Sequence, residues 1–436
     1  MHSQFTSAVL LGLAAFAVAA PASSGESSST VSATSVSSSS SSTASSSTSS
    51  ERFTLIKPAS STTTTSAGSA QSLSTLLSIP ISASSGSTGQ EPFKFPLANG
   101  FPEIKGDSQA VKDLEQEAHG TLSNAGPPPP PHADSLTSLV IVAINEQFEA
   151  AFFSQLIYNI THNATGYQWG DVPDRDNTLA SLKTILAQEE LHEINAQGAV
   201  NAFLNATVEP CEYIFPVQHF NESIILASHF TELVLSTLPD IQTRFGIAGD
   251  DGLIRGVGAV LGQEGEQDGF FRNLFGKNPT PLPFATQGTR EFAFNALFQN
   301  FVLPGSCKQA TLDLLKPNVT EFGVLNVLTQ DITSDKDSVI EFSYQTTTSV
   351  HGSQLLAQGQ LFLTYLNQVN KPISYLITDA QFDGASESVK FSAPFPGKTN
   401  EMNGLTIAAV TNSANFTSPD AVAAATQFGP GLIFIN

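Results

Sequence analysis

Four long stretches of this chain carry apolar residues at the spacing of an α-helix, and they constrain the fold more than any other feature. They cover about residues 134–160, 178–204, 220–238 and 252–275. In the first, Leu136, Val140, Ala143 and Phe153 share one stripe. The third is expected to stop near Pro239, because proline interrupts a helix. Long helices joined by modest connections indicate a mainly α protein built on an antiparallel four-helix bundle.

The fourth stretch is rich in glycine, which costs about 1 kcal/mol relative to alanine inside a helix. Either the helix packs very closely against a neighbour at these positions, or the segment is not a helix. The glycines are Gly256, Gly258, Gly262, Gly265 and Gly269. Shorter helices are expected at 107–120 and 292–302.

After about residue 311 the sequence pattern changes to short runs with β-strand character, separated by Asn, Asp, Gly and Pro. These runs lie at 339–345, 360–366, 373–380, 405–411 and 431–436. The sequence therefore predicts a helical bundle over 134–307 and an added β-rich C-terminal domain over 308–436, the latter of ordinary domain size.

The amino terminus is typical of secretion. Residues 1–20 resemble a signal peptide, with an apolar run from Val9 to Ala20 and small residues at Ala17 and Ala19. A membrane anchor is the alternative, but the run is too short to span a bilayer. Residues 21–90 are rich in Ser and Thr, as in a disordered, O-glycosylated stalk. Residues 91–133 form a lead-in that contains a run of five prolines, Pro127–Pro131.

Two further features agree with an oxidising, extracellular setting. The cysteines Cys211 and Cys307 form either one disulfide or two free buried thiols, and neither has a neighbour typical of a metal site. N-glycosylation sequons are short patterns that also match by chance. They occur at Asn159, Asn163, Asn205, Asn221, Asn318 and Asn415.

The net charge of −21 argues against a partner with a phosphate backbone or an anionic membrane surface, whereas it suits cations. We therefore expect no nucleic acid and no stable membrane insertion, and metal ions as partners.

Carboxylates inside the apolar stripes point to a metal site. A four-helix bundle can hold two metal ions with one Glu from each of two helices and Glu-x-x-His from each of the other two. Ligands three residues apart lie on one face of a helix, and a mixture of carboxylate and imidazole suits Fe or Mn. The stretch QEELHE supplies Glu189 and His192 at this spacing, which leaves Glu190 and Glu193 to be solvated.

The other helices complete most of that pattern. The first offers Glu146 and Glu149, the third Glu232, and the fourth Glu264. Gln267 stands where the second histidine belongs, and Gln binds metal weakly through its amide oxygen. His229, one turn before Glu232, is a candidate substitute. The site therefore holds one ion, two with altered affinity, or none.

These helices also carry a resemblance. The segments AINEQFEAAFFSQ, ILAQEELHEINAQGAV, TELVLSTLPD and LGQEGEQDGFFRNLF resemble the secreted ferritin-like domain proteins of fungi, of the stress-response or late-sexual-development type. These are related to plant desiccation-related proteins. The resemblance covers about residues 97–307, and AAATQFGPGLIFIN is similar to the end of the fungal C-terminal extension. It implies a ferritin-like bundle with ligands at Glu146, Glu189, His192, Glu232 and Glu264.

Two functions follow as expectations. The first is a secreted ferritin-like protein that binds Fe or Mn, as a dinuclear centre if the site is intact, in a stress or developmental response. The second is a non-catalytic wall-associated protein with a degenerate metal site, whose β-rich domain contacts cell-wall carbohydrate or another protein. A hydrolase has little support, because neither GxSxG nor HExxH occurs.

Overall fold

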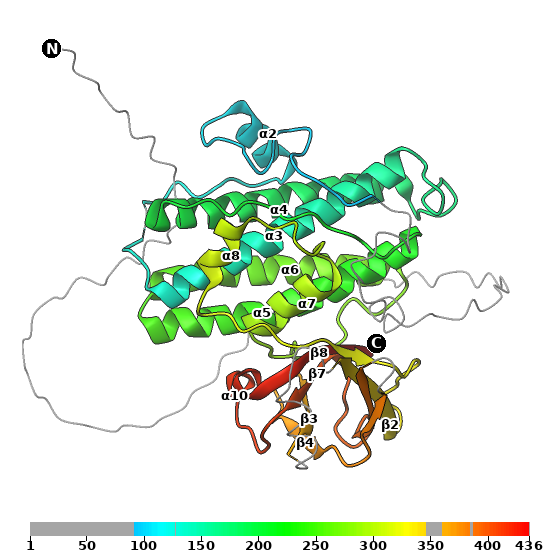
Figure 1. Cartoon of the computed structure of the whole chain (residues 1–436). Helices are drawn as coiled ribbons and strands as arrows, with labels where there is room; N and C mark the ends of the chain where they lie inside the picture. Colours follow the sequence, from blue (N-terminus) through cyan, green and yellow to red (C-terminus); the bar gives the residue numbers. More distant parts are fainter. Residues whose placement is uncertain (1–90, 127, 346–359, 384–386, 436) are drawn as a thin grey trace, which may run out of the picture. The chain divides into compact units, whose positions relative to one another are not determined.

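The computed structural model describes residues 91–126, 128–345, 360–383 and 387–435. The expected signal peptide and Ser/Thr-rich stalk lie outside the described residues. Within those ranges the chain has seven α-helices followed, toward the carboxyl terminus, by two antiparallel sheets, with an eighth helix before the last strand (Figure 1). The expectation of a helical part followed by a β-rich part is confirmed at this level.

Four helices are much longer than the rest and lie side by side (Figure 1). They are α3 (Ala133–Thr161), α4 (Arg175–Leu204), α5 (Phe220–Ala248) and α6 (Ile254–Leu274). The main packing partners are α3 with α4 and α5 with α6, and α3 also packs against α5. Two of them, Ala133–Thr161 and Phe220–Ala248, are long and apolar enough to cross a membrane by composition alone, but most of each apolar window is buried, as in core helices.

Side-chain contacts fix the direction of these helices. In each packed pair, residues that rise in number along one helix meet residues that fall in number along the other, so the pairs run antiparallel. The contacts that establish this are Gln147–Glu193 and Ile160–Arg175 between α3 and α4, Ser228–Asp268 and Ile254–Gln242 between α5 and α6, and Asp134–Arg244 and Phe148–Phe230 between α3 and α5.

Helix α5 does not stop at Pro239 but continues nine residues further, to Ala248. The prediction of an end there was wrong, because Ile241 and Phe245 beyond the proline are buried in the helical core and hold the chain helical. A proline leaves a carbonyl of the preceding turn without its helical partner. For Pro239 this is the carbonyl of Leu235. In the same turn, the backbone N–H of Gly288 donates to the Ser236 carbonyl at 3.0 Å, an approach that a side chain at position 288 would obstruct.

Close packing accounts for only some of the glycines of α6. The segment is a helix, but a Cβ at Gly262 or Gly265 would meet nothing within 4 Å, so close packing is wrong for these two positions. Gly258 and Gly269 do lie against neighbours, with the Gln242 amide 3.0 Å and the Pro279 carbonyl oxygen 3.4 Å from the places of their Cβ atoms.

Four shorter helices accompany them. Helix α2 (Gln109–Glu117) packs on α4, and α7 (Arg290–Asn300) packs on α5, α3 and β8. Helix α8 (Gln309–Leu315) lies against α3, and α10 (Pro419–Ala425) against β7. A short 3-10 helix, η1 (Asp251–Leu253), precedes α6.

The two sheets have the strand orders β1-β2-β6-β5 and β4-β3-β7-β8. The strands are β1 (Leu325–Val327), β2 (Ser338–Gln345), β3 (Phe362–Asn367), β4 (Ile373–Leu376), β5 (Gln381–Asp383), β6 (Ser388–Phe395), β7 (Gly404–Thr411) and β8 (Thr426–Ile435). One apolar core lies between the sheets, with Phe342, Tyr365 and Phe428 among its members. A second joins β7 and β8 to α7, α10 and Leu233 of α5, so β7 and β8 also pack on the helices.

The cysteines form the disulfide Cys211–Cys307, as one of the two alternatives predicted, and they close a loop of sequence separation 96. It ties the α4–α5 connection to the segment after α7. Five of the sequon asparagines, Asn163, Asn205, Asn221, Asn318 and Asn415, are exposed, whereas Asn159 is half-buried. Their glycosylation stays a prediction.

Candidate metal centre

Three of the long helices bring four predicted ligands to one place. Glu146 comes from α3, Glu189 and His192 from α4, and Glu264 from α6. One ligand atom from each lies within 4.8 Å of every other. The i, i+3 spacing places Glu189 and His192 on the same face of α4, and the antiparallel neighbours supply the other two carboxylates at the same level.

The imidazole stands among the carboxylates. His192 Nδ1 lies 3.0 Å from Glu189 Oε2, 3.6 Å from Glu146 Oε2 and 3.9 Å from Glu264 Oε1. The His192 side chain keeps a 16% exposed fraction, whereas Glu189 and Glu264 are fully buried. Burial alone would lower the pKa of His192, but the charges of Glu189 and Glu146 hold it well above its ordinary value.

Several of these carboxylate oxygens are buried without a hydrogen-bond partner. They are Glu146 Oε2, Glu149 Oε2 and both oxygens of Glu264. Burial raises the pKa of Glu146 to about 7, and burial together with the charges of neighbouring carboxylates raises the pKa of Glu149 and of Glu264 well above the ordinary value. In contrast, His192 and hydrogen bonds outweigh burial at Glu189 and lower its pKa. Buried carboxylates of this kind need a proton or a cation.

The two predicted residues that flank this group on the same helices have different surroundings. Glu149 lies one turn beyond Glu146 and is buried, and its Oε1 accepts a hydrogen bond from Asn145 Nδ2 at 3.2 Å. Gln267, three residues after Glu264, donates from Nε2 to Glu189 Oε1. Its own Oε1 is buried without a partner, so the amide braces Glu189 and still presents one free acceptor to the interior.

Glu232 and His229 do not join the group. Glu232 Oε1 accepts from Arg272 Nη1 of α6 at 3.1 Å. This guanidinium supplies the positive charge that a metal would otherwise supply. His229 is stacked on Phe434 of β8, with ring centroids 3.7 Å apart, and its Nδ1 has no hydrogen-bond partner. Burial and the charge of Arg272 lower the pKa of His229 to about 3.

Glu190 and Glu193 are buried, at 1% and 0% exposed, so the expectation that they are solvated was wrong. The reason is that the lead-in covers α4 at Glu190 and that α3 covers it at Glu193. Asn99 of the lead-in donates to Glu190 at 2.6 Å, and Gln147 of α3 donates to Glu193 at 2.9 Å. Burial raises the pKa of Glu190 to about 7 and that of Glu193 to about 8.

A cavity of about 70 Å³ lies beside the group, enclosed by residues of α3, α4, α5, η1 and α6. Glu146, His192 and Asn195 are its polar walls, and the rest is mostly aliphatic, with Pro128 also lining it. A solute in this cavity would therefore touch two of the four candidate ligands.

The donor set fits a metal ion. Three carboxylates and one imidazole are the ligand types that Fe, Mn and Zn accept, and oxygens of Glu146 and Glu264 have no hydrogen bond that such a metal–ligand bond would displace. The sequence predicted all four members of the group. It did not predict that Asn99 and Gln147 pair with Glu190 and Glu193, because only the presence of Asn and Gln in the neighbouring segments pointed to such pairs. In comparisons with known proteins, no protein-family model and no curated protein matches this chain.

Proposed function

We propose that this chain is a secreted ferritin-like protein that binds iron or manganese through Glu146, Glu189, His192 and Glu264, and that it acts in a stress or developmental response. The observation that carries the proposal is the gathering of four ligand atoms within 4.8 Å in the core, three of them on buried carboxylates. Unpartnered oxygens on Glu146 and Glu264 favour a cation over a set of internal hydrogen bonds.

Helix topology supports the ferritin-like part of the proposal. Because α4 and α5 both run antiparallel to α3, they run parallel to each other, and the connection between Leu204 and Phe220 must return along the whole length of the helices. Its 15 residues can span about 50 Å when extended, and a helix of 29 residues is about 44 Å long. A four-helix bundle with one such crossover is the ferritin-like arrangement.

We infer that one ion is held more firmly than a second. The four gathered ligands suffice for one ion. A second ion would need the two positions that here carry Gln267 and an Arg272-paired Glu232. Glu149, which lies one turn beyond Glu146 and has a buried Oε2 without a partner, would be the next ligand recruited.

The residues of this chain would do the following work at the site. Glu189 orients His192 through the 3.0 Å contact, and Gln267 in turn holds Glu189. Coordination requires deprotonated ligands, so binding releases protons from His192 and from Glu146 or Glu264. When bound, Fe or Mn would supply redox chemistry toward oxygen or peroxide.

Metal analysis of the purified, glycosylated chain tests this function. The protein is reconstituted with Fe(II) or Mn(II) without oxygen, desalted, and its metal content per chain is measured. We expect retained metal in the native chain, and its loss in Glu189→Ala and His192→Ala. Glu190→Gln is the matched control, because it is a buried neighbour outside the ligand group, and it should keep its metal. A native chain that retains no metal would overturn the proposal.

Gln267 and the Glu232–Arg272 ion pair favour a second candidate function, a wall-associated interaction protein that kept the fold and lost the chemistry. In this case the β-rich region would contact cell-wall carbohydrate. The two candidates differ in one measurement: a melting temperature that neither metal nor chelator changes, with the chain retained in wall fractions, favours this second one.

A further inference from the structure

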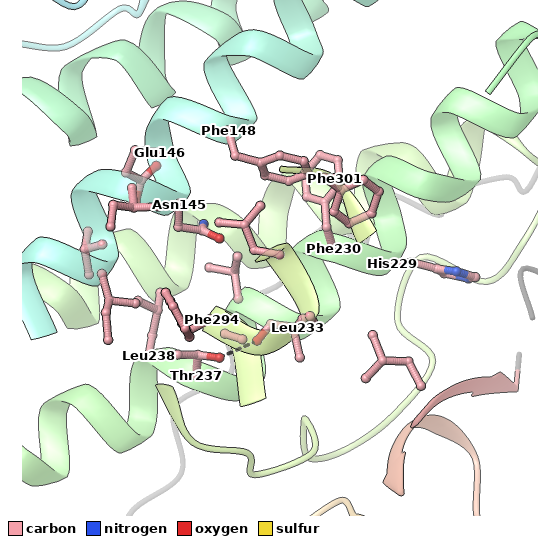
Figure 2. A pocket seen from close by; sticks show the side chains of 18 of the residues that line it. Asn145, Glu146, Phe148, His229, Phe230, Leu233, Thr237, Leu238, Phe294 and Phe301 are labelled. Atoms are coloured by element: carbon pink, nitrogen blue, oxygen red, sulfur yellow. Dashed lines mark hydrogen bonds between the residues drawn. The ribbon is translucent and has the colours of Figure 1, made fainter. Parts of the chain in front are cut away.

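A separate cavity of about 50 Å³ reaches the candidate metal centre from the side of the β-rich region. Its walls come from α3, α5, α7, Phe301 and the strand β8, which contributes Leu432 and Phe434. Figure 2 shows Asn145 and Glu146 on one side of it and His229 on the opposite side. The C-terminal strand thus forms part of the wall of a space that ends on a candidate metal ligand.

This cavity offers almost nothing to a polar molecule. Of the 21 lining residues, only four are polar, and two of these already donate a hydrogen bond to another residue. Thr237 Oγ1 donates to the Leu233 carbonyl at 2.8 Å, and Asn145 Nδ2 donates to Glu149. A buried water needs two to four polar partners. The two lining atoms that are buried without a hydrogen-bond partner, Glu146 Oε2 and His229 Nδ1, belong to residues on opposite sides of the cavity, so the polar part of its wall is small and divided.

Size narrows the class of occupant further. Apolar cavities of about 150 Å³ take up benzene or xenon and stay free of water. A space about one third of that volume is too small for an aromatic ring or an alkyl chain. It suits a single small apolar atom or molecule, such as xenon or a diatomic gas.

The position of the cavity connects it to the ligand group. Glu146 lines it and also belongs to the four gathered residues. This cavity is a neighbour of the cavity of about 70 Å³ beside His192, because Val142, Glu146 and Leu238 line both spaces. An apolar gas held here would lie next to the Glu146 side of the centre.

We propose that this cavity between α3, α5, α7 and β8 is a binding site for dioxygen, which the C-terminal strand helps to enclose beside Glu146. That the gas then meets a metal ion rests on the proposed function. The binding of a small apolar gas does not.

Xenon is the probe for the site itself. Crystals of the full glycosylated chain are pressurised with xenon, and its position is read from anomalous scattering. We expect xenon between Leu233, Ala296 and Phe434. No xenon there overturns the proposal, and so does the binding of benzene by the native chain, because it would contradict the size argument.

Two variants change the space in opposite directions. Ala296 lines the cavity and is 1% exposed, so Ala296→Val should fill it and abolish xenon binding. Ala151 is equally buried but lines neither cavity, and Ala151→Val is the control that should keep xenon. If Ala296→Val does not fold, Leu233→Ala tests the same idea by enlargement: it should keep xenon and admit benzene. Xenon that persists in Ala296→Val, or benzene excluded from Leu233→Ala, counts against the proposal.

The identity of the gas is tested by rapid mixing of Fe(II)-loaded chain with low concentrations of dioxygen. Ala296→Val should slow iron oxidation without changing the iron bound per chain, and Ala151→Val should not. Equal rates in both variants with xenon lost only from Ala296→Val overturn the assignment to dioxygen. A chain that binds no iron refutes the proposed function instead, and leaves the xenon result standing.

Discussion

Replacing Glu264 by methionine tests whether this residue is a metal ligand or an ordinary buried carboxyl group. Glu264 is fully buried and neither of its oxygens has a hydrogen-bond partner. Each unsatisfied buried acceptor costs about 1–3 kcal/mol, and methionine has a similar length and adapts to irregular space. In chelator, we therefore expect Glu264→Met to raise the free energy of unfolding by about 1–3 kcal/mol.

Metal works against this difference. At a metal concentration about 100 times the dissociation constant, binding stabilises the native chain by about 2.7 kcal/mol. Glu264→Met removes one of the four ligands and should lose most of that gain. Urea unfolding of both proteins, with chelator and with Fe(II) or Mn(II), measures the two differences directly.

Glu193→Met is the matched control. Glu193 is as buried as Glu264, but its Oε1 accepts from Gln147 Nε2. Its replacement leaves one N–H of that amide without an acceptor, while the other still donates to the Val208 carbonyl at 2.8 Å. This variant should therefore be less stable by about 1–3 kcal/mol in both conditions. The reasoning is refuted if Glu264→Met is also less stable in chelator, or if metal stabilises it as much as it stabilises the native chain.

Three other predictions follow from the described residues. Gly262→Ala and Gly265→Ala should each raise the free energy of unfolding by about 0.5–1 kcal/mol, because both positions are helical and open; denaturant titration of each variant decides, and a loss of stability would contradict it. Replacing both Cys211 and Cys307 by alanine should cost up to about 4.7 kcal/mol, from the long loop that the disulfide closes, and an unchanged urea midpoint would exclude such a contribution. Burial and a nearby guanidinium lower the pKa of His229 to about 3, so the unfolded chain takes up a proton below about pH 6.5 that the folded chain does not. Stability should therefore fall as the pH drops from about 6.5 toward 3, by at most about 1.4 kcal/mol per pH unit from this group. His229→Phe should reduce that slope in unfolding titrations at a series of pH values, and parallel profiles would disprove the assignment.

The apolar spacing located the four long helices to within a few residues, except at Pro239. That error has a general cause: a proline penalty of about 3 kcal/mol is a local quantity, whereas the burial of Ile241 and Phe245 beyond it comes from neighbours far along the chain. The glycines of α6 show the opposite case. Their local cost suggested close packing, but at Gly262 and Gly265 the structure supplies none.

The sequence by itself determined which side chains can meet within one helix. Glu189 and His192 share a face because of the helical repeat, and no tertiary contact is needed to know it. Glu190 falls on another face of α4, whereas Glu193, four residues after Glu189, lies near the same one. Whether each of them is solvated or buried depends on what covers it. Asn99 and Gln147 do so, from distant parts of the chain.

Tertiary structure alone decided the partners across helices. The sequence predicted Glu264 and Glu232 alike as ligands. In the structure Glu264 lies beside His192, whereas Glu232 pairs with Arg272. Tertiary structure also decided that Leu432 and Phe434 enclose a cavity beside Glu146. These outcomes depend on helix register and on the docking of β8. Both are set by the packing of the whole core rather than by local propensity, so periodicity in the sequence could not reveal them.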